Sequence, residues 1–301
     1  MLFCNKNYIQ IRIYFKYKIY MYKAYQGDDP LNIDWDDAYD NSGHIDGAAQ
    51  YPPKWTKLAQ GFRDETNLGG RVELDLAYGD EAREKLDIFH PQGTAKGLAV
   101  FAHGGFWRAF DKSSWSHLAA GAVSRGWAVC LPSYTLAPDA RISHITRQFA
   151  RALEFAANRI DGPIRLAGHS AGGHLVSRMV CADAPVQANV SDRIEHVLSI
   201  SGVHDLRPLL QTTLNETLML DEAEASSESA VLCRPVDPCS ITCWVGGDER
   251  PAFIAQNDLL ANIWGGLGAN TKSVHVPAKH HFNVIEDLCD AGSELTRDFI
   301  G

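Results

Sequence analysis

The stretch PIRLAGHSAGGHLVSRMVCA, residues 163–182, decides the fold expected for this chain of 301 residues. An apolar run of strand character leads directly into Gly168-His169-Ser170-Ala171-Gly172, and a helical pattern follows. A strand that turns this sharply into a helix leaves the serine strained, with its hydroxyl exposed. Glycines on both sides keep side chains out of the crowded turn. We therefore predict that Ser170 is an activated nucleophile rather than an ordinary serine in a glycine-rich turn.

Short apolar runs recur on both sides of this stretch and alternate with amphipathic segments such as residues 142–160. Continuous apolar strands separated by helices are typical of a mostly parallel sheet covered on both faces. A hairpin around the turn at residues 80–83 is expected to add antiparallel strands at one edge. Strands are predicted within residues 72–79, 84–92, 97–105, 126–134, 163–170, 196–203, 240–247 and 271–277.

Two regions depart from this alternation. Residues 204–236 form an excursion before the penultimate strand. We expect either a small helical cap or pocket wall, or a surface insertion with an acidic tip. Residues 1–22 carry Lys6, Arg12, Lys16 and Lys18 without an acidic residue, and their cations interrupt every apolar run. They are interpreted as an N-terminal extension, with translation starting at Met1 or Met21. A membrane-surface or transit role is the rival interpretation. Residues 23–301 are expected to form one domain.

Composition limits the partners and the compartment. The net charge of −9, without a long basic run, argues against nucleic acid, and no segment predicts a membrane span. Seven dispersed cysteines without a C-x-x-C pair indicate reduced thiols in a cytoplasmic protein, with zinc binding a weaker alternative. The twelve histidines are also dispersed, so no metal or other cofactor is expected. A homodimer is compatible with the sequence.

A second glycine motif, His103-Gly104-Gly105-Phe106-Trp107, ends the predicted strand before it. Such a loop lets backbone N–H groups approach a reacting carbonyl. We predict an oxyanion hole from the N–H groups of Gly104, Gly105 and Phe106, together with Ala171 at the start of the helix. His103 is interpreted as a brace for the loop. The rings of Phe106 and Trp107 are placed to wall a substrate site, although such rings are often core residues.

A serine nucleophile also needs a base and an acid, which follow it in the order serine, acid, histidine. The strand ending near Pro277 delivers His280 and His281, and a helix is expected to begin at Phe282 or Asn283. The penultimate strand delivers Asp248 and Glu249. Strand position alone leaves both choices open. Asp205 follows the preceding strand and is interpreted as a cap or loop brace, and His275 as structural.

The motifs HGGFW, GHSAGG, GGDERPAFIAQ and KHHFNVIEDL together resemble the kynurenine formamidase (arylformamidase) branch of the α/β hydrolases. The resemblance extends from about Asp34 to the C-terminus. It implies Glu249 as the acid, because it precedes RPAFIAQ, and His281 as the base, because it precedes FNVI. Many members have aspartate in place of this glutamate, which keeps Asp248 open. The implied activity is hydrolysis of an aryl formamide such as N-formylkynurenine by a Ser-His-acid triad.

Two other functions remain open at this point. Many relatives of this kind are carboxylesterases that act on small esters. A catalytically silent hydrolase fold used as a binding module is the third hypothesis. The presence of serine, acid, histidine and oxyanion glycines in one chain argues against it, because silent members usually lose at least one. Metal-dependent hydrolysis is disfavoured, since no paired histidine motif occurs with a third ligand nearby.

Overall fold

The computed structural model describes residues 33–301, and its centre is a single sheet with the strand order β1-β2-β4-β3-β5-β6-β7-β8. The hairpin strands β1 and β2 pair antiparallel, β2 joins β4 antiparallel, and all remaining pairs are parallel. The strands are β1 Val72–Ala77, β2 Lys85–Phe89, β3 Leu98–Ala102, β4 Ala128–Pro132, β5 Ile164–His169, β6 Ile194–Ile200, β7 Ser240–Gly246 and β8 Asn270–Val276. The predicted sheet is confirmed, including its antiparallel edge.

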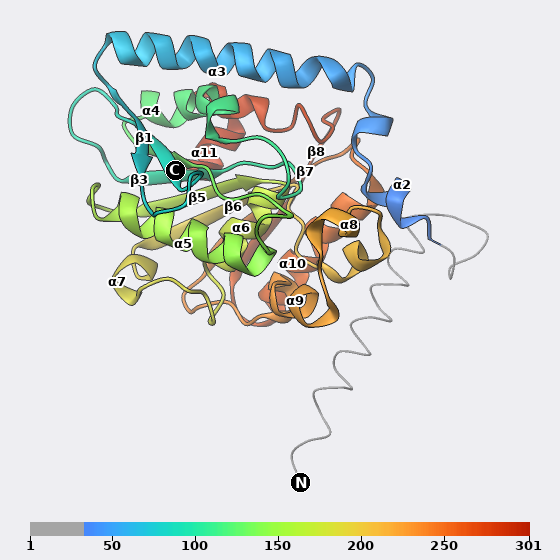
Figure 1. Cartoon of the computed structure of the whole chain (residues 1–301). Coiled ribbons are helices and arrows are strands. Elements are labelled where there is room, and N and C mark those ends of the chain that lie inside the picture. Colours follow the sequence, from blue (N-terminus) through green and yellow to red (C-terminus); the bar gives the residue numbers. More distant parts are fainter. Residues whose placement is uncertain (1–32) are drawn as a thin grey trace.

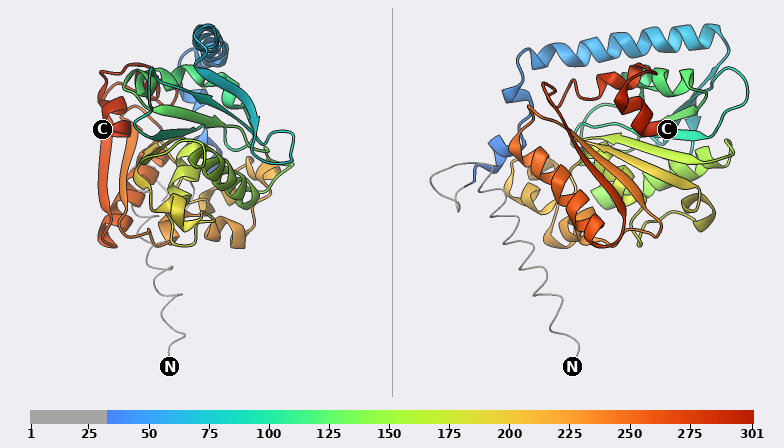
Figure 2. Two further views of the ribbon diagram at one scale, coloured as in Figure 1. Left: turned by 90° about the vertical axis from the view of Figure 1, so that its left-hand side faces the viewer. Right: turned by 180° about the vertical axis from the view of Figure 1, so that it is seen from behind.

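Helices cover both faces of the sheet (Figures 1 and 2). One face carries α5, α6 and α10, and the other carries α4 and α11 with the long helix α3 outside them. The helices are α2 Trp35–Tyr39, α3 Tyr51–Leu68, α4 Ala120–Ser124, α5 Ile142–Ala157, α6 Ala171–Arg178, α7 Ala188–Ser191, α8 Asn215–Leu218, α9 Glu222–Ser227, α10 Pro251–Gly266 and α11 Glu294–Ile300. Two apolar cores result, one on each side of the sheet.

The central strands are apolar throughout because both of their faces are covered. Every residue of β3 and β4 is buried, as expected for inner strands of a parallel sheet. The edge strand β8 instead alternates between exposed and half-buried residues. Helix α5 buries a stripe of apolar residues against the sheet, which explains its strong helical period.

The excursion before β7 is a small helical cap, which we define as residues 204–236. It contains η5 Arg207–Gln211, α8, α9 and η6 Ala230–Leu232. Asp221 begins α9 by accepting a hydrogen bond from the backbone N–H of Glu224. The cap lies beside α10 and α2 at one end of the molecule (Figure 1). Of the two alternatives left open by the sequence, the helical cap is therefore present.

The helix predicted from Phe282 or Asn283 is not formed. The chain instead makes turns and the short 3₁₀ helix η7 Glu286–Cys289. Phe282, Ile285 and Leu288 recur every third residue and pack into the second core, a spacing that suits a 3₁₀ turn better than an α-helix. The remaining short 3₁₀ helices are η1 Ser42–His44, η2 Ala48–Gln50, η3 Lys112–Ser114 and η4 Ser116–Ala119.

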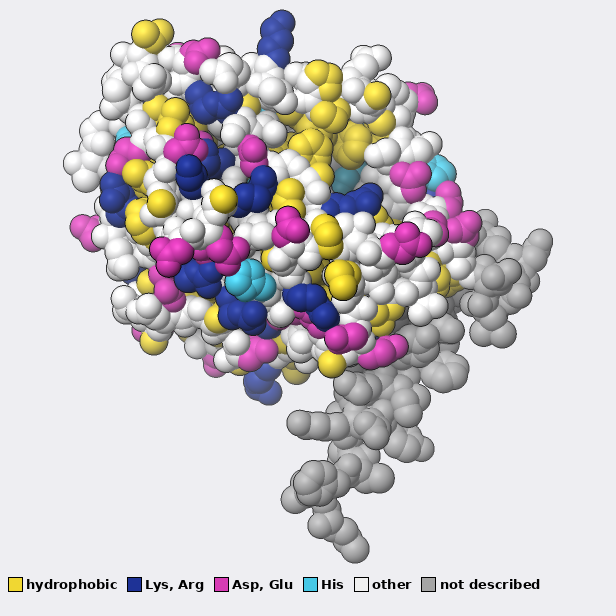
Figure 3. Space-filling model, viewed as in Figure 1, with side chains coloured by type: hydrophobic (Ala, Val, Ile, Leu, Met, Phe, Trp, Pro, Cys, Tyr) yellow, Lys and Arg dark blue, Asp and Glu magenta, His cyan; other side chains and the backbone are white. Residues whose placement is uncertain are grey.

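The boundary predicted between residues 22 and 23 lies outside the described residues. Within residues 33–301, none of the helices combines the length and apolar character needed to cross a bilayer. On the face seen in Figure 3, charged side chains of both signs are interspersed, while hydrophobic side chains gather near the start of α3.

The close packing of the turn between β5 and α6 leads to a prediction for the stability of a glycine variant. A Cβ atom at Gly172 would overlap the carbonyl group of Ala102, which is backbone of β3 and cannot yield easily. We expect Gly172→Ala to lower the free energy of unfolding by about 1–3 kcal/mol, the usual cost of overpacking. Gly61→Ala is the matched control, because a Cβ there meets nothing within 4 Å and lies on the exposed side of α3.

Chemical denaturation of both variants measures the difference. We expect Gly61→Ala to raise the free energy of unfolding by roughly 0.5–1 kcal/mol, the usual gain of alanine over glycine inside a helix. Equal effects of the two changes would contradict the packing that we assign to Gly172.

Candidate active site

Ser170 occupies the turn between β5 and α6, with φ 56° and ψ −117°. This is a backbone conformation that L-residues other than glycine rarely adopt. The backbone N–H of Ser170 donates to the carbonyl oxygen of Ile200 on the neighbouring strand, at 2.8 Å. Tertiary contacts therefore hold the strained turn in place, and Ser170 lines a cavity that we describe below.

The two glycines of the motif make this turn sterically feasible. A Cβ at Gly168 would overlap the carbonyl group of Gly172, and a Cβ at Gly172 would overlap that of Ala102. The turn thus brings α6 against the end of β3, where the second glycine motif begins. Both residues act as the sequence predicted, by leaving space for backbone.

The loop after β3 approaches Ser170 closely. A Cβ at Gly104 would lie 3.1 Å from that of Ser170, closer than most such contacts, so a side chain there would press on the serine. Gly105, Phe106 and Trp107 all have positive φ, at 110°, 47° and 54°. Among the described residues, no hydrogen bond uses the N–H groups of Gly105, Phe106 or Ala171. These three donors are therefore available at the turn.

His103 braces this loop, as predicted. Its ring is buried, stacks on Tyr134 at 4.4 Å between centroids, and lies 2.7 Å through Nδ1 from the carbonyl oxygen of Gly104. The Tyr134 hydroxyl donates to the carbonyl oxygen of His103 at 2.9 Å. Burial lowers the pKa of His103 to about 4, so the imidazole is neutral near pH 7.

Glu249 and His281 form a buried hydrogen-bonded pair across the loops that follow β7 and β8. His281 Nδ1 donates to Glu249 Oε2 at 2.7 Å, and both side chains are almost completely shielded from solvent. Glu249 Oε1 accepts from the Ser201 hydroxyl at 2.5 Å and from the backbone N–H of Gly246 at 2.8 Å. Since Nδ1 is engaged, His281 is left with Nε2 for the cavity.

Asp248 and His280, the alternative acid and base, do not line the cavity. Asp248 is exposed, and its backbone N–H donates to the carbonyl oxygen of Lys279. His280 turns toward α3, where its Nε2 lies 3.1 Å from the Tyr51 hydroxyl. His281, in contrast, lines the same cavity as Ser170, and its carbonyl oxygen accepts from His169 Nε2 at 2.9 Å. A hydrogen bond thus joins Glu249 to His281, and His281 lines the same cavity as Ser170.

Trp107 does not reach the cavity. Its side chain is fully buried in the first core, edge-on to His174 at 5.1 Å between ring centroids. The preceding Phe106, which also has a positive φ, lines the cavity instead. Of the two rings considered from the sequence, one is a wall residue and the other a core residue. Asp205 and His275 also lie away from the cavity, with Arg207 and Asp258 as their partners.

The cavity above Ser170 has a volume of about 1050 Å³, and several aromatic side chains form part of its lining. Trp55 and Trp115 pack at 4.7 Å between ring centroids, and Phe282 meets Trp55 edge-on at 5.3 Å. The opposite wall includes Phe106 and Tyr39. Acidic and basic side chains also line it: Asp36, Asp37, Asp40 and Arg108.

Sequence reasoning missed two contributions to this site. The segment before α3, including Asn41 and Ala48, lies far from the motifs in sequence but closes one side of the cavity. Ser201 also carries no motif, yet its hydroxyl holds the carboxylate of Glu249. Ser201 directly follows the end of β6 and has a positive φ of 52°. No sequence pattern indicates that backbone conformation.

Buried neutral histidines surround the elbow. Burial lowers the pKa of His174 to about 3 and that of His204 to about 3, and it lowers the pKa of His169 well below its ordinary range. His174 Nε2 lies 2.9 Å from the carbonyl oxygen of Glu228, and His204 lies between two serine hydroxyls. These rings act as neutral polar packing rather than as cations.

The cavity has no metal-binding arrangement. Among residues 33–301, the group of side chains that could share an ion is Cys181, Asp183 and Cys233, behind α6 and outside the cavity lining.

An elbow serine at the carboxyl end of a mostly parallel sheet, with a histidine and an acid after later strands, defines the class of α/β hydrolases. Residues 99–235 match a family model described as an α/β-hydrolase fold. The chain is 31% identical to a kynurenine formamidase of Danio rerio over 74% of this chain and 79% of that protein. It is 30% identical to a kynurenine formamidase of Salmo salar over 80% and 85%.

Solved structures agree with this architecture. One from Silicibacter sp. TM1040, provisionally described as a thioesterase, is 49% identical and has a TM-score of 0.85, covering 90% of this chain and 100% of that chain. An esterase of Pyrobaculum calidifontis, 16% identical, shares the fold with a TM-score of 0.60 over 80% and 87%. The chain belongs to the kynurenine formamidase family of α/β hydrolases.

The buried histidines predict a loss of stability in mild acid. Since their folded pKa values of about 3 to 4 lie below the ordinary value of 6.5, the unfolded chain binds protons first as pH falls. The contribution of these neutral histidines to the free energy of unfolding is fully present above pH 6.5. It is lost progressively as pH falls from there toward 3 to 4. We expect a cost on the order of 2 kcal/mol per histidine at about pH 5.

Urea denaturation at about pH 7.5 and about pH 5 measures this effect. We expect His174→Gln to reduce the difference in the free energy of unfolding between the two conditions. A variant with the same pH dependence as the wild type would show that His174 is not a buried neutral group in the folded protein.

Proposed function

We propose that this protein is a serine hydrolase that removes the formyl group from an aryl formamide of the N-formylkynurenine type, releasing formate and an arylamine. The observation that carries this proposal is Ser170 in a strained turn, facing the same aromatic cavity as the carboxylate-bound His281. The kynurenine formamidases among its relatives support the choice of substrate.

In the proposed mechanism, the Ser170 hydroxyl attacks the formyl carbon while His281 Nε2 takes its proton. Glu249 accepts the Nδ1 proton in a hydrogen bond, which fixes the tautomer and stabilises the imidazolium that forms. His281 then delivers the proton to the leaving nitrogen, and the arylamine departs from a formyl-serine intermediate. Water attacks that intermediate with His281 as base, and formate leaves as Ser170 regains its proton.

The negative charge that develops on the carbonyl oxygen needs donors already in place. The N–H groups of Gly105, Phe106 and Ala171 are unused by other described groups, and Gly104 lets the loop approach the serine. We propose that they form the oxyanion hole. One such donor is typically worth about 3 kcal/mol of transition-state stabilisation.

The walls of the cavity support an aryl leaving group. Trp55, Trp115 and Phe282 form one aromatic wall, and Phe106 lies beside the glycine loop. A formyl group is the smallest acyl group, so it suits the tight space between the loop and Ser170. Arg108 at the cavity lining supplies a cation for an anionic substituent of the leaving group.

Hydrolysis of small esters or thioesters is the second candidate function. It is favoured by the 49% identity to the structure provisionally described as a thioesterase. The same nucleophile, base and oxyanion donors would serve both reactions, because both proceed by acyl transfer to serine. The substrate's leaving group separates the two candidates.

We also propose a cytoplasmic location. The six cysteines within the described residues are free thiols, although two of them lie close together. Reduced thiols in this number are typical of a reducing compartment.

Four variants test the assignment of the catalytic residues. Ser170→Ala and His281→Ala should each lower kcat by at least about 10³-fold, and Glu249→Gln by about 10²- to 10⁴-fold, because the imidazole loses its orienting charge. His280→Ala is the matched control and should stay within a few-fold of the wild type, since its ring faces Tyr51.

A fluorophosphonate probe gives an independent readout of the same variants. We expect labelling of the wild type and of His280→Ala but not of Ser170→Ala. Absence of labelling in a folded wild-type protein would favour a silent binding module. Normal turnover by His281→Ala would refute the assignment of the base.

The substrate class is tested by kcat/KM for three compounds: N-formylkynurenine, a short aryl ester and a short-chain acyl thioester. We expect the formamide to be turned over with a kcat/KM in the ordinary enzymatic range of about 10⁴ M⁻¹s⁻¹ or more. If only the ester or thioester is hydrolysed, with Ser170 still labelled by the probe, the triad stands and the formamidase proposal fails.

A further inference from the structure

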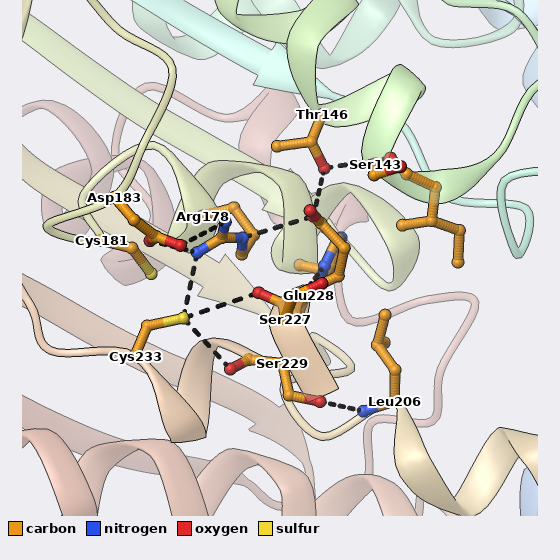
Figure 4. Close-up of polar contacts among 12 residues, drawn as sticks. Ser143, Thr146, Arg178, Cys181, Asp183, Leu206, Ser227, Glu228, Ser229 and Cys233 are labelled. Atoms are coloured by element: carbon orange, nitrogen blue, oxygen red, sulfur yellow. Dashed lines mark hydrogen bonds and ion pairs between the residues drawn. The ribbon is translucent and has the colours of Figure 1, made fainter. Parts of the chain in front are cut away.

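Behind α6, on the side away from the substrate cavity, two cysteines meet at the base of the cap. Cys181 follows α6, and Cys233 follows η6 near the end of the cap. The two segments pair through a short antiparallel bridge between Cys181 and Pro235, and the backbone N–H of Ala182 donates to the carbonyl oxygen of Arg234 at 2.8 Å. Backbone contacts thus hold the two thiols side by side (Figure 4).

The sulfur atoms of Cys181 and Cys233 and a carboxylate oxygen of Asp183 all lie within 4.8 Å of one another. Arg178, the last residue of α6, is buried between them and the cap. Its Nη1 donates to Cys233 Sγ at 3.1 Å and to Asp183 Oδ1 at 2.9 Å, and its Nε donates to Glu228 Oε2 at 3.3 Å. A buried guanidinium therefore contacts one sulfur of the pair directly.

This environment separates the two thiols chemically. A hydrogen bond from Cys181 and the positive charge of Arg178 lower the pKa of Cys233 below its ordinary value. Burial raises the pKa of Cys181, whose thiol donates to the carbonyl oxygen of Ser177 at 3.5 Å. Cys233 Sγ also lies 3.5 Å from the carbonyl oxygen of Ser229. A cysteine of lowered pKa beside a guanidinium, with a second thiol within reach, is the arrangement of a reactive cysteine and a resolving cysteine.

The reactive sulfur is also accessible. Cys233 is half-buried and lines a surface hollow of about 450 Å³ together with Asp183, Ser227 and Arg234. Cys181 is buried behind it. A small oxidant entering this hollow therefore meets Cys233 first.

A metal ion is the other ligand that such a group could take, and the contacts disfavour it. The Arg178 guanidinium already donates hydrogen bonds to both Cys233 and Asp183, two of the three candidate ligands. A divalent cation would have to displace this buried positive charge or lie against it.

We propose that Cys233 and Cys181 form a thiol pair that a hydroperoxide oxidises to a disulfide. The Cys233 thiolate attacks the outer oxygen of the peroxide, the O–O bond breaks, and Cys233 sulfenic acid and an alkoxide or hydroxide form. The Cys181 sulfur then displaces the sulfenic oxygen, which leaves as water with the Cys181 proton, and an S–S bond forms. Two electrons pass from the two thiols to the peroxide.

The proposed disulfide joins the end of α6 to the end of the cap. Ser170 immediately precedes the first turn of α6, and the cap supplies Thr213 and Leu214 to the cavity lining. The bond would thus connect the element that carries the nucleophile with the element that covers part of the cavity. It does not depend on which carbonyl Ser170 attacks.

The test uses the full reduced chain treated with hydrogen peroxide, followed by peptide mapping without reduction. We expect a Cys181–Cys233 disulfide, seen as linked peptides that have lost two hydrogens. Cys289 is the internal control. The residue as a whole is exposed, but its thiol group is shielded, and this burial raises its pKa to about 11. We therefore expect Cys289 to react at least about tenfold more slowly than Cys233.

Two variants separate the steps. In Cys181→Ser the reaction should stop at Cys233 sulfenic acid, which dimedone traps. In Cys233→Ser, Cys181 should remain reduced. Circular dichroism checks that both variants fold, and mapping of the wild type tests the proposal even if they do not.

Three results would overturn the proposal. The first is modification of Cys289 as fast as that of Cys233, and the second is the absence of a disulfide between the pair. The third is stoichiometric binding of added zinc by the reduced protein, lost in Cys233→Ser, which would make the group a metal site.

Discussion

The close contact between the start of α6 and the end of β3 is the constraint on which the site depends. It exists because Gly168 and Gly172 present only backbone at the turn, where any side chain would overlap a carbonyl group. The contact forces Ser170 into a positive φ and brings it beside Gly104 of the glycine loop. Ser170 and the unused N–H groups of the glycine loop are thus positioned by one packing interaction between backbones.

Glu249 and His281 follow β7 and β8, which lie on the other side of β5 from β3. The parallel direction of these strands explains why the two side chains meet. The carboxyl ends of β5, β7 and β8 lie at one edge, so the loops that begin there converge. Glu249 is then fixed by Ser201 and Gly246, which leaves its second oxygen for His281. Two hydrogen bonds to one oxygen hold the carboxylate in the orientation that the imidazole needs.

A structural feature can be predicted from the sequence when the residues of one segment determine it. The strands, the turn at Ser170 and the helical period of α5 are local patterns of this kind. The place of Trp107 is not a local pattern, because two adjacent rings of one loop lie on different sides, Phe106 at the cavity and Trp107 in the core. The choice of Glu249 over Asp248 needed a family resemblance, since adjacent carboxylates differ only in which one the loop turns inward. Ser201 and Asn41 reach the site through tertiary contacts that no motif records.

Helix α6 extends from the turn that carries Ser170 to the base of the cap. Its first turn follows Ser170, and its last residue, Arg178, contacts Cys233 of the cap and Glu228, whose carboxylate also accepts from Thr146 on α5. The cap is thus attached to the helical layer by buried polar contacts as well as by apolar packing. A buried charged network is costly to break, because each partner left behind loses its hydrogen bonds. Changes at Cys233 therefore act on the attachment of the cap rather than on an isolated surface thiol.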